Sequence, residues 1–98
     1  MLFVSSGAAR FNRPYWGGYA ITKAALEVLT FTYAAECGGT NVKANALNPG
    51  PTRTRMRAQA FPGEDPATLP APEELVPLIV EMMSPECSKN GELVNFRR

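Results

Sequence analysis

The stretch YAITKAALEVLTFTYAAECGG, residues 19–39, is typical of one long helix with a defined end. It contains no proline or glycine from Tyr19 to Cys37, and the two glycines that follow provide a stop signal. Its apolar residues cover more than one narrow stripe. We therefore expect this helix to pack against two neighbours, one of them a sheet and the other a helix.

Tyr19 and Lys23 lie four residues apart in this helix. Side chains at that spacing share one face, about one turn apart, so both can enter the same cleft. A cation beside a phenol favours the phenolate and brings a phenol pKa toward the range of a general acid or base. The spacing also occurs by chance in ordinary helices, where Lys23 would instead form a surface pair with Glu27.

Composition and charge limit the class of protein. A chain of 98 residues with 45% hydrophobic and 19% charged residues is typical of one small globular domain. A formal net charge of +1 gives no electrostatic reason to expect a nucleic acid or an anionic membrane as partner, which favours small-molecule substrates. The first ten residues lack a basic flank and a long apolar run, so we expect neither a signal peptide nor a membrane span.

The two cysteines, Cys37 and Cys87, do not form a metal-binding pattern. They lie 50 residues apart, and the chain has no histidine to complete a zinc site. This usage favours free thiols in the reducing cytoplasm, with a single disulfide as the alternative.

The segments around the long helix alternate between strand and helix patterns. We predict strands over 2–5, 42–47 and 92–96, a loop over 10–18 and a second helix over 73–83. Six of the nine prolines fall between 49 and 72, so that segment is predicted to be a long loop with at most short helical pieces. This order predicts an α/β fold of about three parallel strands and two main helices.

Three signals occur in order along the chain: FVSSGAAR at 3–10, YAITKAAL at 19–26 and VKANALNPGPTRT at 42–54. Together they resemble the short-chain dehydrogenase/reductase family. In that family a strand ending in Ser, a Tyr-x-x-x-Lys helix and a strand ending in Asn-Pro-Gly follow one another. The resemblance implies an oxidoreductase that transfers a hydride between NAD or NADP and a carbonyl or alcohol substrate.

The resemblance also implies roles for individual residues. Tyr19 would give a proton to the substrate carbonyl in reduction, or take one from the alcohol in oxidation. Lys23 would assist the ionisation of Tyr19 and hold the nicotinamide ribose. Ser6, 13 residues before Tyr19, would hydrogen-bond the reacting oxygen and stabilise its developing charge. Ser5 would be a structural hydroxyl, unless a one-residue shift in the alignment exchanges the two serines.

The Asn-Pro-Gly segment of the family passes the nicotinamide. Pro49, Gly50, Thr52 and Thr54 are therefore candidate cofactor contacts, with the backbone near 52 facing the carboxamide and the Thr54 hydroxyl near a phosphate. A glycine turn also allows a close approach of backbone to ligand. The alternative for the two threonines is simple solvation in a loop.

Two other groups of residues near these motifs are open to two interpretations. Tyr15 and Trp16 either line the substrate pocket or pack the loop. Arg53, Arg55 and Arg57 either contact a phosphate or acidic substrate or, as we favour, form a solvated and partly helical face.

Part of the family pattern is missing. The sequence contains no G-x-x-x-G-x-G loop, the element that binds pyrophosphate at a helix N-terminus, and no Asn-Asn-Ala-Gly element. Residues 2–96 resemble only the fifth to seventh strands of the family and their helices. We therefore predict that residues 1–98 form the C-terminal, catalytic half of a doubly wound, Rossmann-like parallel sheet, without its nucleotide-binding N-terminal half.

Two hypotheses of function follow. The first is an NAD(P)-dependent oxidoreductase that is incomplete as this chain. The second is a truncated, non-catalytic fragment that acts as an association module. The resemblance further implies self-association through the helix over 19–37, whereas the choice between NAD and NADP and the identity of the substrate stay open.

Overall fold

The computed structural model describes residues 1–10 and 14–96. Its elements are β1 (Leu2–Val4), α1 (Gly17–Glu36), β2 (Asn45–Asn48), α2 (Arg55–Ala60), α3 (Val76–Met83) and β3 (Leu93–Asn95), with 3-10 turns η1 (Gly7–Ala9), η2 (Pro66–Thr68) and η3 (Pro72–Leu75). The predicted α/β fold is confirmed, because the three strands form one parallel sheet in the order β1-β2-β3.

The central strand β2 forms the core of the sheet. Leu47 pairs with Val4 on one side and with Val94 on the other. Ala46 and Leu47 are almost completely buried, as expected for a parallel strand that is covered on both faces. The strand begins at Asn45, three residues later than the predicted start.

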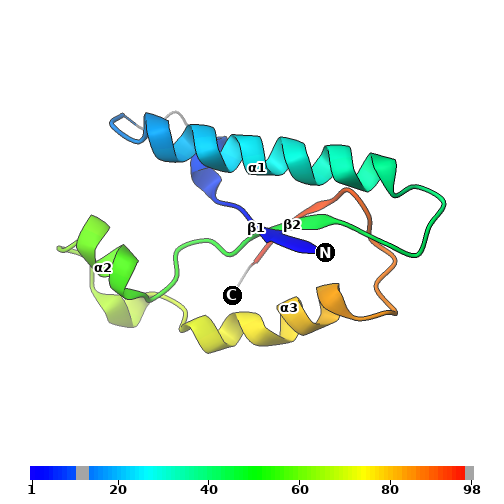
Figure 1. The fold of residues 1–98 in the computed structure, drawn as a ribbon. Coiled ribbons are helices and arrows are strands. Elements are labelled where there is room, and N and C mark those ends of the chain that lie inside the picture. The colour runs from blue at the N-terminus through cyan, green and yellow to red at the C-terminus, as the bar shows by residue number, and fades with distance from the viewer. Residues whose placement is uncertain (11–13, 97–98) are drawn as a thin grey trace.

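The two main helices cover opposite faces of the sheet, with α1 above it and α3 below it in Figure 1. Each crossover connects a strand to its next neighbour in the same direction across the sheet, but α1 and α3 lie on opposite faces. The β1-α1-β2 and β2-α3-β3 crossovers therefore have opposite hands. One of the two is therefore left-handed, which is rare. The carboxyl ends of the strands stay open at one edge, and α2 lies beyond that edge (Figure 1).

Helix α1 begins two residues earlier than the sequence predicted. The Ala20 amide donates to the Trp16 carbonyl at 2.8 Å, which makes Gly17 and Gly18 the first helical residues instead of the end of a loop. Residues 11–13 of the predicted loop lie outside the described residues. At the other end, the helix ends at Glu36 with Cys37 as its C-cap, close to the end that the glycines predicted. Gly39, two residues beyond the cap, has φ +83°, a left-handed conformation that glycine adopts readily.

The proline-rich segment contains short helical pieces, as predicted. Helix α2 is capped by Thr54, whose Oγ1 accepts a hydrogen bond from the Arg57 amide at 3.1 Å. The predicted helix over 73–83 is divided into η3 and α3, and Pro77 lies in the first turn of α3, where its missing N–H costs no helical hydrogen bond.

The core is thin for a chain of this length. The accessible surface is 6619 Å², whereas a folded monomer of 10.6 kDa exposes about 5,500 Å². The radius of gyration is 14.7 Å, against about 12.6 Å for a compact domain of this length. The exposed surface includes large apolar side chains, among them Ile21, Val28 and Leu29 on α1. Of the two neighbours expected for α1, the described residues supply the sheet and no helix on the opposite face.

Candidate active site

The carboxyl ends of β1 and β2, the start of α1 and the segment around α2 enclose a cavity of about 560 Å³. All seven site residues predicted from the sequence line it: Ser6, Tyr19, Lys23, Pro49, Gly50, Thr52 and Thr54. Open parallel sheets bind their ligands at this edge, so the cavity is the candidate active site.

Tyr19 and Lys23 enter the cavity from the same face of α1. The Lys23 ammonium lies 5.7 Å from the centre of the Tyr19 ring and donates a hydrogen bond to the Val4 carbonyl at 3.2 Å. The lysine is thereby fixed between the phenol and the end of β1. The alternative of a surface pair between Lys23 and Glu27 is wrong, because Glu27 is buried against other partners.

Ser6 lies two residues after the end of β1 and is the N-cap of the turn η1. Its Oγ accepts a hydrogen bond from the Ala8 amide at 3.2 Å. A serine oxygen that accepts one bond still carries a proton to donate. Ser6 can therefore hold the turn and donate to a ligand in the cavity at the same time.

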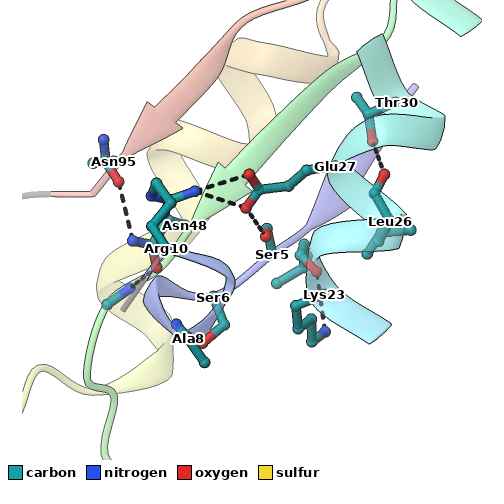
Figure 2. A network of polar contacts seen from close by, with 12 residues as sticks. Ser5, Ser6, Ala8, Arg10, Lys23, Leu26, Glu27, Thr30, Asn48 and Asn95 are labelled. Carbon is teal, nitrogen blue, oxygen red and sulfur yellow. Dashed lines mark hydrogen bonds and ion pairs between the residues drawn. The ribbon is translucent and has the colours of Figure 1, made fainter. Parts of the chain in front are cut away.

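Ser5 also borders the cavity, but its hydroxyl is bound to Glu27 Oε2. Arg10 contacts the same carboxylate, with Nη1 at 2.8 Å from Oε2 and 2.9 Å from Oε1 (Figure 2). Ser5 is 3% exposed and Glu27 9% exposed, so both groups rely on these partners instead of water. Sequence reasoning missed this cluster.

The turn after β2 is held by side-chain amides. Asn48 donates from Nδ2 to Asn95 Oδ1 at 3.0 Å, and Asn48 Oδ1 accepts from the Gly50 amide at 3.1 Å (Figure 2 shows the two asparagines). Gly50 has φ +70°, a conformation that side chains rarely allow. The Thr52 hydroxyl donates to the Gly50 carbonyl at 3.1 Å, so this threonine also stabilises the turn.

Aromatic side chains form one wall of the cavity. The Trp16 ring stacks on Phe61 with centres 5.8 Å apart and meets the Tyr19 ring edge-on at 5.7 Å. Trp16 and Phe61 both line the cavity. Tyr15 does not, since it is fully exposed, so the interpretation of Tyr15 as a pocket residue is wrong.

Only one of the three arginines between 53 and 57 lines the cavity. Arg57 lies 3.8 Å above the Phe61 ring and donates to Glu64 at 2.8 Å from Nε and 3.0 Å from Nη2. These hydrogen bonds lower the pKa of Glu64 below its usual 4.5 and raise the pKa of Arg57. Arg53 and Arg55 are exposed and lie outside the lining, which fits the solvated face that we favoured.

Other features of the described residues bear on the site less directly. Cys37 and Cys87 are both free thiols. Within residues 1–10 and 14–96 no three acidic or sulfur ligands come together as a metal site, and no helix has the length and apolar character needed to cross a membrane.

Comparison with known proteins establishes the family. A family profile described as short chain dehydrogenase matches residues 1–65, about two thirds of the chain. The chain belongs to the short-chain dehydrogenase family. The family predicted from the three ordered motifs is thereby confirmed.

Relatives and solved structures agree with this assignment. The chain is 42% identical over 83 residues to the uncharacterized oxidoreductase YciK of Escherichia coli K12. A short-chain dehydrogenase from Pseudomonas syringae superposes with a TM-score of 0.88 at 46% identity. Another from Escherichia coli CFT073, crystallised with NADPH, superposes with a TM-score of 0.88 at 39% identity.

This short-chain dehydrogenase sequence spans only part of those proteins. The match to YciK covers 85% of the chain but 32% of the relative. Each of the two superpositions covers 96% of the chain and 39% of the longer structure. The matched part of the chain therefore corresponds to 32–39% of the length of these relatives.

Two parts of the candidate site gave no clear signal in the sequence. Glu27 follows Lys23 by four residues, which places it on the same face, but nothing in the spacing names Ser5 and Arg10 as its partners. Phe61 lies in the proline-rich segment, and only its aromatic character could have suggested a contact with Trp16.

Proposed function

We propose that residues 1–98 carry the catalytic part of an NAD(P)-dependent oxidoreductase that interconverts a carbonyl and an alcohol by hydride transfer. The observation that carries the proposal is the meeting of Ser6, Tyr19 and Lys23 in one cavity at the carboxyl edge of a parallel sheet. The similar structure from Escherichia coli crystallised with NADPH supports a nicotinamide dinucleotide as the cofactor.

In this proposal Tyr19 and Ser6 act on the same substrate oxygen, and Lys23 acts on Tyr19. Tyr19 gives its proton to the carbonyl oxygen in reduction and takes it back in oxidation. Ser6 donates a hydrogen bond to that oxygen and stabilises the charge that develops on it. The Lys23 ammonium, 5.7 Å from the Tyr19 ring, stabilises the phenolate that remains after proton transfer. The bound nicotinamide cofactor supplies or accepts the hydride.

The turn after β2 would hold the nicotinamide end of the cofactor. Gly50 has no Cβ and a positive φ, so the backbone of Pro49–Thr52 can approach a ligand closely. Thr54 Oγ1 accepts the capping bond of α2 and keeps its own proton for a phosphate oxygen. Lys23 uses one N–H for Val4 and has two more for ribose hydroxyls.

We also propose that residues 1–98 are the catalytic half of a Rossmann-like domain. The chain contains no G-x-x-x-G-x-G loop, and the relatives described above are about two and a half times as long. The portion that binds the adenosine pyrophosphate would then belong to the rest of such a domain, and neither NAD nor NADP is favoured by the residues at hand.

The second candidate function is association without catalysis, and the apolar outer face of α1 favours it. The chain exposes about 1,100 Å² more than a compact monomer of its mass, and a standard interface buries about 800 Å² per partner. We propose a second copy of this chain as the occupant of that face. Association and catalysis are compatible, because the two faces of α1 are distinct.

The catalytic proposal is tested by NADPH oxidation in the presence of a panel of aldehydes and ketones. Lys23→Met should lower the rate about 100-fold, whereas Lys89→Met, at an exposed lysine outside the cavity, should leave it unchanged. A Lys23→Met rate equal to that of the wild type would contradict the proposed role of the lysine.

Calorimetric titration with NADPH and NADH separates the two candidate functions. Saturable binding of either cofactor supports the oxidoreductase. A chain with the circular dichroism of a folded α/β protein but without cofactor binding would leave association as the function of this chain.

A further inference from the structure

We propose that Glu27 is a positioning residue, whose carboxylate fixes Ser6 in the cavity by holding the chain on both sides of it. The proposal rests on the proposed function for its catalytic meaning. Glu27 does not line the cavity and touches neither Tyr19 nor Lys23 in the contacts described above. It acts through Ser5 and Arg10.

The first contact fixes the residue just before Ser6. The Ser5 hydroxyl donates to Glu27 Oε2, and the Ser5 amide donates to the Leu47 carbonyl of β2 at 2.7 Å. Ser5 is therefore tied to α1 by its side chain and to the sheet by its backbone. With 3% of its surface exposed, it has no water to replace either bond.

The second contact fixes the far end of the turn that Ser6 begins. Arg10 closes η1, because its amide donates to the Gly7 carbonyl at 2.9 Å. Its guanidinium reaches back to both oxygens of Glu27, at 2.8 and 2.9 Å. Figure 2 shows the carboxylate between Ser5 and Arg10, with the turn that carries Ser6 and Ala8 beside them.

The position of Glu27 on α1 relates this clamp to the chemistry. Tyr19, Lys23 and Glu27 follow one another at intervals of four residues, so one rigid helix face carries all three. The Glu27 carboxylate holds the segment around Ser6 against this face, and it thereby fixes the position of the Ser6 hydroxyl relative to the Tyr19 phenol. Such preorganisation matters because hydrogen-bond donors stabilise a developing charge only when they are already in place.

A purely structural role for the same cluster predicts a different behaviour. In that role the ion pair would contribute only to the free energy of unfolding of the whole chain and would not position Ser6. Global destabilisation exposes all amides by the same factor. Loss of a local clamp releases only the turn that it holds.

Amide hydrogen exchange on the 98-residue chain distinguishes the two roles without any turnover. In Glu27→Gln, the amides of Ala8, Ala9 and Arg10 should exchange about tenfold faster or more, because the charged acceptor is lost. The Ala46 and Phe96 amides, bonded within the sheet, should keep their rates. Glu36→Gln, at an exposed position of the same helix, is the matched control and should change none of these rates.

Equal acceleration of turn and sheet amides, or no change in either, would overturn the proposal. Should Glu27→Gln fail to fold, Arg10→Met removes only the contact at the partly exposed end. It should accelerate exchange of the Ala9 and Arg10 amides and leave that of Ala46 unchanged. Unchanged exchange rates at positions 9 and 10 in this variant would also contradict the proposed positioning role of Glu27.

Kinetics on a double mutant then test whether Glu27 acts through Ser6. Glu27→Gln should lower kcat about tenfold with little change in KM, and it should have no further effect in a Ser6→Ala background. The same loss in both backgrounds would refute a role through Ser6. A wild-type chain without turnover would sink the proposed function but not the exchange result, so the two failures are distinguishable.

Discussion

The two faces of α1 have the opposite polarity to those of an ordinary amphipathic helix, because polar side chains face the sheet and apolar ones face outward. The face toward the sheet carries polar and small residues: Tyr19, Lys23, Glu27, Thr30 and Ala34. The opposite face carries Ile21, Val28 and Leu29, which are 70%, 64% and 55% exposed. A surface helix usually buries its apolar side. Under the proposed function, the inner face would place chemical groups at the end of β1, and the outer face would be the surface for self-association.

The inner face tolerates its polar groups because each has a partner. The Thr30 hydroxyl, completely buried, donates to the Leu26 carbonyl at 2.8 Å (Figure 2). Glu27 is satisfied by Ser5 and Arg10. Across residues 1–10 and 14–96, no buried side-chain nitrogen or oxygen lacks a hydrogen bond. The small side chain of Ala34 allows the backbone at Gly91 to lie close to α1. A Cβ added to Gly91 would lie 3.4 Å from the Cβ of Ala34.

The largest expected effect comes from removing the phenol of the inner face. Tyr19→Phe should lower hydride transfer from NADPH by about 10²- to 10⁴-fold, because the substrate oxygen loses its proton donor. Tyr33→Phe is the matched control on the same helix, outside the cavity, and should keep the wild-type rate. Equal rates for the two variants, measured by loss of nicotinamide absorbance, would remove Tyr19 from the chemistry.

Packing is the next difference between the two faces. Ala34→Leu should destabilise the chain by about 1–3 kcal/mol, because the larger side chain meets the backbone near Gly91. Ala35→Leu, one residue later and exposed, should change the free energy of unfolding by less than about 0.5 kcal/mol. Urea denaturation measures both values, and equal costs would mean that α1 does not sit against the sheet as described.

Charge on the outer face should affect association instead of stability. Leu29→Lys should weaken self-association by about tenfold or more, because a desolvated ammonium would replace an apolar contact. Gln59→Lys adds the same charge on α2 and should leave the association constant unchanged. Sedimentation equilibrium provides the comparison. A wild-type chain that stays monomeric at high concentration would refute the second copy as the occupant.

The smallest expected effect concerns the α2 side of the cavity, opposite the inner face. Arg57 lowers the pKa of Glu64 below 4.5 in the folded chain. The stabilisation from this pair is therefore fully present above pH 4.5 and is lost as the pH falls through the lowered pKa of Glu64. Trp16 stacks on Phe61 and is the only tryptophan, so its fluorescence reports the change. Glu64→Gln should abolish this acid transition. A transition of the same size in the variant would assign it to another group.

The parts of the fold that sequence could predict are those set by local patterns. The run without glycine or proline from Tyr19 to Cys37 and the β-α-β order determine α1 and the parallel sheet. The exact start of α1 was missed, because glycines are weak helix formers and only the Trp16 carbonyl bond brings Gly17 and Gly18 into the helix. The opposite hands of the two crossovers depend on tertiary packing and have no sequence signature.

The site divides in the same way. The family resemblance carried by Ser6, Tyr19, Lys23 and the Asn-Pro-Gly turn predicted site residues that all line one cavity. The partners of Glu27 could not be predicted, because Ser5 and Arg10 are 22 and 17 residues away and meet it only after β1 and α1 have packed. Tyr15 shows the converse error, since an aromatic residue next to a pocket residue can point entirely to solvent.

A map of amide shifts caused by NADPH on the isotope-labelled chain tests the central claim most directly. The claim is that the inner face of α1, with the ends of β1 and β2, forms the nicotinamide site. It predicts saturable shifts at Ser6, Lys23 and Gly50 and none at Val28 or Leu29. Shifts centred on the outer face, or no shift at any NADPH concentration in a folded chain, would contradict it.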